Sequence, residues 1–162
     1  MRLQHSTISN IHNILQIIND AKVYLKSKEI DQWQHGYPNK SQIEKDIANN
    51  ESYVLINDAN QVIATSMFSI RPEPTYKLID GEWKIKESEQ YGVIHRLAIH
   101  KNHRKKGIAS HMLNEFHQLL NKQHIRSLKI DTHEDNHEMQ YLVKKLGYVY
   151  CGIIFTEYNA KR

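Results

Sequence analysis

The sequence predicts a mixed α/β fold, in which a central, largely antiparallel mixed sheet is flanked by helices. One observation is an early hairpin: residues 53–56 and 61–70 are apolar runs of strand length, joined by the polar turn Asn57-Asp58-Ala59-Asn60. The other is the later half of the chain, where apolar runs alternate with segments of helical spacing. A hairpin followed by strand–helix–strand units is typical of a mixed sheet. With 162 residues, 40% of them apolar, the chain suits one domain spanning residues 1–162.

Two helices are expected before this hairpin. Residues 8–25 carry apolar side chains at helical spacing and predict the first helix. Residues 40–49 predict a shorter second helix, with Ile43 and Ile47 on its inner face. Between the two helices, residues 33–38 form a turn-rich aromatic loop.

The segments that follow the hairpin are of uneven regularity. Residues 71–90 are expected to be irregular, because prolines and a turn at Asp80-Gly81 interrupt them. We expect a central strand ending at Ile99 and a long helix after it, then a strand over 127–132, a helix over about 136–146 and a final strand over 148–156. Cys151 lies in the apolar run of that final strand, which favours a small buried residue over a reactive thiolate.

The stretch from Val93 to Ser110 joins a buried strand, a basic turn and the start of an amphipathic helix. Arg104, Lys105 and Lys106 supply positive charge, and Gly107 lets the backbone approach a ligand closely. The first turn of a helix carries N–H groups without intrahelical partners at the positive end of the helix dipole. These features predict a socket for a diphosphate. The stretch lacks the Gly-Lys-Ser/Thr of a Walker A loop and the glycines of a dinucleotide fingerprint, which argues against nucleoside triphosphates and nicotinamide cofactors.

This segment resembles the acetyl-CoA-binding motif of the GNAT superfamily of N-acetyltransferases, written Arg/Gln-x-x-Gly-x-Gly/Ala. Arg104, Gly107 and Ala109 occupy its three defining positions, and Leu97-Ala98-Ile99 matches the strand that precedes it. The stretch 128–148 is similar to the second motif of the superfamily: a strand, an asparagine, a helix and a Gly-aromatic pair. Two motifs in the right order are more specific than either alone.

The resemblance covers roughly residues 50–155 and implies a sheet that is splayed at the cofactor strand. It also implies an enzyme that transfers the acetyl group of acetyl-CoA to an amine by direct attack in a ternary complex. The central strand and the helix N-terminus would hold the coenzyme, with Asn136 near its thiol end. The expected coenzyme-binding residues are Leu97, Ala98, Ile99, Arg104, Lys105, Lys106, Gly107, Ile108, Ala109, Ser110 and Asn136.

Such a reaction needs a proton acceptor, because an alkylamine near neutral pH is mostly protonated and only the neutral amine attacks. His95 and Asp131 are the candidate catalytic residues. His95 shares a strand face with Leu97, and an imidazole needs little tuning to accept a proton near neutral pH. Asp131 stands where some superfamily members carry a catalytic glutamate. A structural role for His95, and an ion pair of Asp131 with Arg96, are the alternatives.

The general acid departs from the pattern of the superfamily. Many members place a tyrosine seven residues after the motif asparagine, and the corresponding residue here is Val143, which cannot donate a proton. Tyr141 lies roughly 200° around the helix from that position. Tyr148 is expected to pack in the core. The sequence therefore offers no general acid, which leaves water or the incoming amine to protonate the thiolate.

The amine acceptor is expected to enter between the first-helix loop and the insertion at residues 71–90. Its class is a small-molecule or peptide amine, which Glu73 and other acidic residues of the insertion could attract. Four aromatic residues would form its walls, unless they serve local packing: Trp33, Tyr37, Tyr76 and Trp83. Since only about six residues follow Thr156, the last strand of the usual plan is short, absent or supplied by a partner in a homodimer.

Composition argues against other partners. The net charge of +4 is small and interleaved with acidic residues, which does not favour nucleic acid. No apolar run approaches the ~18 residues of a membrane span. A single cysteine excludes an internal disulfide and fits a cytoplasmic location.

Two other readings compete with the transferase. The run from His133 to His137 matches the His-Glu-x-x-His signature of zinc hydrolases, but the two histidines straddle a helix start and would not share a helix face. We therefore expect no metal. The second alternative is a non-catalytic acyl-CoA-binding or sensing domain of the same fold. It stays open because Val143 stands where many members of the superfamily have a tyrosine.

Overall fold

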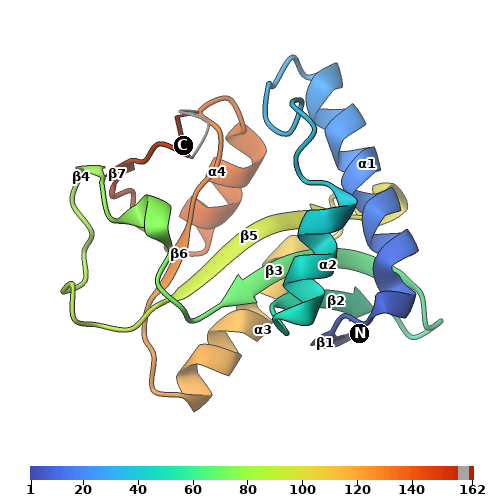
Figure 1. Cartoon of the computed structure of the whole chain (residues 1–162), viewed down its shortest axis with the longest axis horizontal. Coiled ribbons are helices and arrows are strands. Elements are labelled where there is room, and N and C mark those ends of the chain that lie inside the picture. Colours follow the sequence, from blue (N-terminus) through green and yellow to red (C-terminus); the bar gives the residue numbers. More distant parts are fainter. Residues whose placement is uncertain (157–160) are drawn as a thin grey trace.

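The computed structural model describes residues 1–156 and 161–162, and it shows a central sheet with helices on both faces (Figure 1). The sheet has the strand order β1-β2-β3-β5-β6. Neighbouring strands are antiparallel, except β5 and β6, which are parallel. The strands are β1 (Arg2–His5), β2 (Ser52–Ile56), β3 (Val62–Ser69), β5 (Gly92–Ile99) and β6 (Leu128–Ile130). The predicted mixed, largely antiparallel sheet is confirmed.

The helices pack on the sheet through two apolar clusters, one on each face. On one face Ile14, Ile17 and Ile18 pack with Val54 of β2, and on the other Phe116 is fully buried in a larger cluster. Burial of such side chains is the main favourable contribution to folding. The helices are α1 (Ile11–Ser27) and α2 (Lys40–Ala48) on the first face, α3 (Ile108–Lys122) on the second, and α4 (His137–Lys145) beside it.

β5 and β6 separate partway along their length. They pair only where Gly92, Val93 and Ile94 face Leu128, Lys129 and Ile130. Beyond this point β5 bulges: Arg96 has a left-handed backbone with φ of +57°, and the register of β5 with β3 shifts between Thr65 and Met67. The sheet is therefore splayed at β5, as the resemblance implied.

The N-terminal and C-terminal strands differ from the prediction. The sequence did not predict β1, because its four residues form an edge strand whose conformation depends on pairing with β2. The final strand is shorter than the expected 148–156: β7 (Gly152–Ile153) pairs with β4 (Asp80–Gly81) in a separate two-stranded sheet. The two backbones approach so closely that a Cβ on Gly81 would lie 2.2 Å from the Cys151 carbonyl oxygen. The last strand of the usual plan, expected after Thr156, lies mostly outside the described residues, so its three alternatives stay open.

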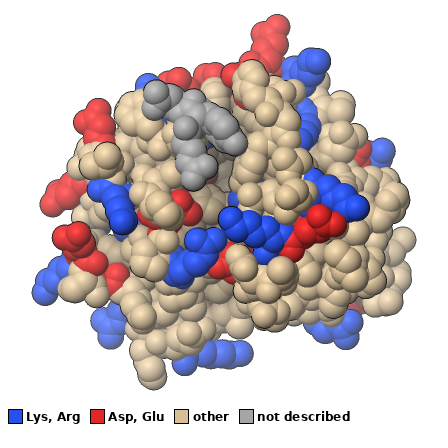
Figure 2. Space-filling model, in the orientation of Figure 1, with Lys and Arg blue, Asp and Glu red and all other residues tan. Residues whose placement is uncertain are grey.

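The insertion and Cys151 also require correction. Residues 71–90 contain a 3-10 helix at Pro74–Tyr76, and Asp80-Gly81 is a strand rather than a turn. Cys151 lies just before β7 and is half-buried, with its Sγ donating to the Val149 carbonyl at 3.4 Å, so it is not a buried strand residue. Within the described residues, the structure has no helix long and apolar enough to cross a membrane. Acidic and basic side chains are interspersed over the face in Figure 2.

Candidate active site

A cavity of about 1490 Å³ opens where β5 and β6 separate. Its walls come from elements far apart in the sequence, including the C-terminal end of α1, the N-terminal turns of α3 and α4, and the segment around Glu73. All but one of the expected coenzyme-binding residues line it: Leu97, Ala98, Ile99, Arg104, Lys105, Gly107, Ile108, Ala109, Ser110 and Asn136. The exception is Lys106, whose Nζ donates to the Asn102 carbonyl at 2.8 Å.

The N-terminus of α3 is exposed to the cavity. Gly107 is its N-cap, with φ of +75° and no side-chain cap, and a Cβ built there would meet no atom within 4 Å. The amides of the first turn have no carbonyl partners inside the helix. Glycine has no side chain, so the space in front of these amides stays empty and an anion can reach them.

Arg104 is fixed beside this turn by three contacts. Its Nη2 donates to the Asp20 carbonyl at 2.9 Å, and its Nε donates to the Ile99 carbonyl at 3.4 Å. The guanidinium also lies 4.5 Å from the ring centroid of Tyr24. The motif arginine thus ties the basic turn to α1 while its side chain lines the cavity.

Asn136 joins the two sides of the cavity. It is the N-cap of α4, where its Oδ1 accepts from the Met139 amide at 3.2 Å, and its Nδ2 donates to Gln32 Oε1 at 2.8 Å. Further along α4, Tyr141 lines the cavity and is 68% exposed, whereas Val143 is not among the lining residues. Sequence reasoning missed Gln32, because nothing in its local pattern indicates a contact with a residue so distant in the chain.

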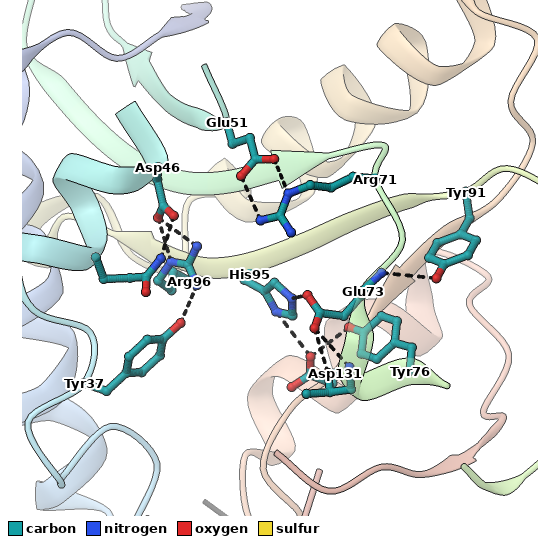
Figure 3. Close-up of polar contacts among 12 residues, drawn as sticks. Tyr37, Asp46, Glu51, Arg71, Glu73, Tyr76, Tyr91, His95, Arg96 and Asp131 are labelled. Atoms are coloured by element: carbon teal, nitrogen blue, oxygen red, sulfur yellow. Dashed lines mark hydrogen bonds and ion pairs between the residues drawn. The ribbon is translucent and has the colours of Figure 1, made fainter. Parts of the chain in front are cut away.

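Three ionisable side chains meet at the other end of the cavity (Figure 3). His95 of β5 lies between two carboxylates: its Nε2 is 2.9 Å from Glu73 Oε2, and its Nδ1 is 3.3 Å from Asp131 Oδ2. Tyr76 donates its hydroxyl to the same Asp131 oxygen at 2.8 Å. The two candidate catalytic residues, His95 and Asp131, are therefore in contact. Glu73, considered from the sequence only as an attraction for cations, completes the group.

The contacts change the protonation of all three residues. Burial alone would lower the pKa of His95, but the hydrogen bonds to Asp131 and Glu73 raise it to about 9. Burial would raise the pKa of Glu73, but the hydrogen bond and charge of His95 lower it to about 2. The pKa of Asp131 is likewise lowered, because His95 and Tyr76 outweigh burial. The raised pKa favours the imidazolium form of His95 at neutral pH, and the role of His95 as the base stays a prediction.

Arg96 is not the partner of Asp131 but of Asp46. Its Nη2 lies 2.7 Å from Asp46 Oδ2, with both side chains almost fully buried, and its Nη1 donates to the Tyr37 hydroxyl (Figure 3). This ion pair fixes the bulge of β5 to α2. Nearby, Arg71 makes two hydrogen bonds to Glu51, at 2.5 and 3.0 Å.

The four aromatic residues divide into two pairs. Trp33 and Tyr37 line the cavity, and their role as walls for the acceptor stays a prediction. Tyr76 and Trp83 are not among its lining residues: Tyr76 is 3% exposed, and the indole N–H of Trp83 donates to the Tyr76 carbonyl at 2.9 Å. These two residues pack the insertion onto the sheet: Tyr76 is buried in a small apolar cluster, and Trp83 packs against that cluster.

The histidines of the zinc-like signature do not converge on one point. His133 precedes α4 and its Nδ1 accepts from the Asp135 amide at 3.1 Å, whereas His137 is the first residue of the helix. In the part of the chain that the structure describes, no group of three or more His, Cys, Asp and Glu side chains is arranged to hold a metal ion.

Comparison with known proteins identifies the family. The sequence profile of the Acetyltransferase (GNAT) family matches residues 13–148, so the chain belongs to this family. No curated protein sequence matches the chain.

Solved structures agree with this assignment. A GNAT-family acetyltransferase from Streptococcus agalactiae superposes with a TM-score of 0.87 at 28% identity, over 99% of this chain and 91% of that one. A GNAT-family acetyltransferase from Listeria monocytogenes gives 0.76 at 16% identity, over 93% and 87%. An aminoglycoside antibiotic 6'-N-acetyltransferase from Acinetobacter haemolyticus gives 0.64 at 16% identity, over 93% and 92%, and shares the fold.

Proposed function

We propose that this chain is a single-domain N-acetyltransferase, which transfers the acetyl group of acetyl-CoA to a small-molecule or peptide amine. The observation that carries the proposal is the uncapped N-terminus of α3, which opens into the cavity at Gly107. Its amides and the basic turn beside it suit the pyrophosphate of coenzyme A. The proposal includes a cytoplasmic location and no metal, nucleic acid or membrane partner.

The proposed reaction is direct attack. The ammonium form of the acceptor loses one proton, its nitrogen then forms a bond to the thioester carbon, and the carbon–sulfur bond breaks. The nitrogen loses a second proton, the thiolate gains one, and the products are the N-acetyl amide, free coenzyme A and one released proton. Backbone N–H groups of β5 between Leu97 and Ile99 suit the thioester oxygen, because β6 has left that edge of the sheet.

Asn136 is proposed to contact the coenzyme near its thiol. Its amide group is engaged with Gln32, so coenzyme binding would exchange that hydrogen bond for one to the pantetheine arm. Trp33 and Tyr37 are the proposed walls for the acceptor. Val143 stands at the tyrosine position of the family and cannot donate a proton. The proton on sulfur is therefore proposed to come from water or from the amine.

Calorimetric titration with acetyl-CoA tests the proposal. The Gly107→Glu variant should lose submillimolar binding, because its carboxylate would lie before the amides of α3. Gly147→Glu is the matched control: Gly147 also has a positive φ, of +86°, and open space around it, but it does not line the cavity. Failure of the folded wild-type protein to bind acetyl-CoA would refute the proposal.

A second assay separates an enzyme from a binding domain. Release of free thiol in the presence of primary amines should accompany formation of the N-acetyl product, identified by mass spectrometry. Binding of acetyl-CoA without product from any amine would instead support the non-catalytic acyl-CoA-binding alternative. That alternative is favoured by Val143, which replaces the proton-donating tyrosine of the family.

A further inference from the structure

A side-chain contact crosses the cavity between α1 and α4. Tyr24, near the C-terminal end of α1, donates its hydroxyl to Glu138 Oε1 in the first turn of α4, at 2.5 Å. The two residues are 114 positions apart in the chain, and both line the cavity. α1 packs on one face of the sheet, whereas α4 lies beside α3 on the other (Figure 1). The contact therefore joins opposite walls of the cavity, where β5 and β6 separate.

Tyr24 also contacts the basic turn, because the guanidinium of Arg104 lies 4.5 Å from the centroid of its ring. Arg104, Tyr24 and Glu138 thus form a continuous bridge from the basic turn to the start of α4. A coenzyme with its pyrophosphate at Gly107 and its thiol beside Asn136 would span the same two elements, since Asn136 is the N-cap of α4. The bridge and the coenzyme therefore compete for this part of the cavity.

A second hydrogen bond joins the same walls. Asn136 donates from Nδ2 to Gln32 Oε1 at 2.8 Å, and Gln32 is only 9% exposed. The backbone carbonyl of Gln32 accepts from Gln34 Nε2 at 3.0 Å, which fixes the segment after α1 in this position. Tyr24, Gln32, Asn136 and Glu138 thus form a clasp across the cavity, and both of its hydrogen bonds end at the start of α4.

The clasp also holds a negative charge at the cavity. The hydrogen bond to Glu138 is the largest cause of the raised pKa of Tyr24, followed by burial. Tyr24 therefore remains the hydroxyl donor at neutral pH, and Glu138 is the acceptor. Because the phosphates of coenzyme A are negative as well, a carboxylate kept at the cavity opposes their approach. Both the contact and its charge act against coenzyme binding.

We propose that the clasp closes the cavity of the ligand-free protein, so that coenzyme A binds only after the contact between Tyr24 and Glu138 has opened. This inference rests on the proposed function, since it requires that the cavity holds the coenzyme. When only a fraction of a protein is competent to bind, its apparent affinity falls in proportion to that fraction. The clasp thus sets both the affinity for the coenzyme and the rate at which it enters.

Tyr24→Phe tests the clasp. The variant loses the hydroxyl that holds Glu138, but it keeps the aromatic ring beside Arg104 and the net charge of the protein. Calorimetric titration should show that coenzyme A binds about three- to tenfold more tightly, because a hydrogen bond to a carboxylate no longer favours the closed form. A hydroxyl that contacted the coenzyme would give the opposite result, since its removal would weaken binding.

Stopped-flow kinetics measure the entry of the coenzyme. Trp33 lines the cavity, so its fluorescence can report the arrival of coenzyme A. The association rate constant of Tyr24→Phe should rise by the same factor as the affinity, because the variant changes only the ligand-free state. Tyr53→Phe is the matched control: it loses a hydroxyl that lies 3.2 Å from His5 Nε2, outside the cavity lining, and should bind as the wild type does.

Glu138→Ala separates the contact from the charge. This variant removes both, so coenzyme binding should tighten more than in Tyr24→Phe. The additional gain should disappear at high salt, where the charges are screened. Adding Tyr24→Phe to Glu138→Ala should have no further effect, because the contact is already lost.

The outcomes separate this inference from the proposed function. If the folded wild-type protein does not bind coenzyme A, both are refuted. If it binds, the inference alone is overturned by an affinity or an association rate constant that does not rise in Tyr24→Phe, or by additive effects of the two substitutions. Should Tyr24→Phe not fold, Glu138→Ala at high salt decides the question: faster association supports the clasp, and an unchanged rate overturns it.

Discussion

The ion pair between Arg96 and Asp46 should contribute strongly to the stability of the fold. The exposed fractions of the two side chains are 7% and 4%, so water screens their charges very little. Asp46 Oδ2 faces two nitrogens of Arg96, at 2.9 and 2.7 Å, and its Oδ1 accepts from Gln42 at 2.8 Å. Asp46→Asn retains the shape of the side chain but removes its charge, which leaves the guanidinium buried without compensation.

The expected cost follows from that uncompensated charge. Breaking one partner of a buried ion pair destabilises a protein by about 3–5 kcal/mol. For a chain of this length, this loss corresponds to a fall in Tm of roughly 6–20 °C. Replacing both partners by residues without charge costs much less, because no charge is then left buried. Asp46→Asn combined with Arg96→Met should therefore be more stable than Asp46→Asn alone.

Urea denaturation at neutral pH measures these effects. The midpoint of Asp46→Asn should fall without a change in slope, since the surface exposed on unfolding is unchanged. The double variant should recover part of the lost free energy of unfolding. A loss below about 1 kcal/mol in Asp46→Asn would refute the argument, because that is the range of solvent-screened surface pairs.

Three further predictions concern other parts of the molecule. The pKa of His95 is raised from 6.5 to about 9, so its contribution to stability is fully present below about pH 6.5 and is lost as the pH rises through 9. Glu73, with its pKa lowered from 4.5 to about 2, contributes above about pH 4.5 and loses that contribution as the pH falls toward 2. Urea unfolding across this range should show both limbs in the wild-type protein, whereas His95→Gln should lose the alkaline limb and keep a weaker acidic one, because Thr75 still donates to Glu73. Phe116→Ala should cost about 3–5 kcal/mol in urea unfolding, because Phe116 is fully buried and stacks on Phe68 at 4.6 Å; a loss below about 1 kcal/mol would contradict its place in the core. Asn136→Ala removes the N-cap of α4 and should cost about 1–2 kcal/mol in a thermal melt, whereas an unchanged Tm would show that the cap contributes nothing.

Local sequence patterns predicted the elements that carry their own signal. The helical spacing in residues 8–25 and the apolar runs of the hairpin correspond to α1, β2 and β3 within a few residues. The strand–turn–helix pattern around Gly107 indicated the proposed coenzyme segment from residues adjacent in the chain. Such features depend on periodicity and on glycine and helix-end chemistry, which act over a few residues.

Contacts between distant segments were beyond local patterns. β1 and β7 exist because β2 and β4 lie beside them, and nothing in their own few residues requires a strand. Tyr76 and Trp83 look like other exposed loop aromatics in the sequence, yet they cover each other in the fold. Sequence reasoning therefore placed them at the acceptor site.

The sequence by itself determined the family, the mixed sheet and the strand–turn–helix segment proposed to hold the coenzyme, because each depends on residues that are neighbours in the chain. Only the tertiary structure decided the protonation of His95. Glu73 and Asp131 approach it from an irregular segment and from the end of β6, and pKa values depend on charges within a few ångströms, whatever their separation in sequence. For the same reason, Arg96 proved to be the partner of Asp46 and not of Asp131.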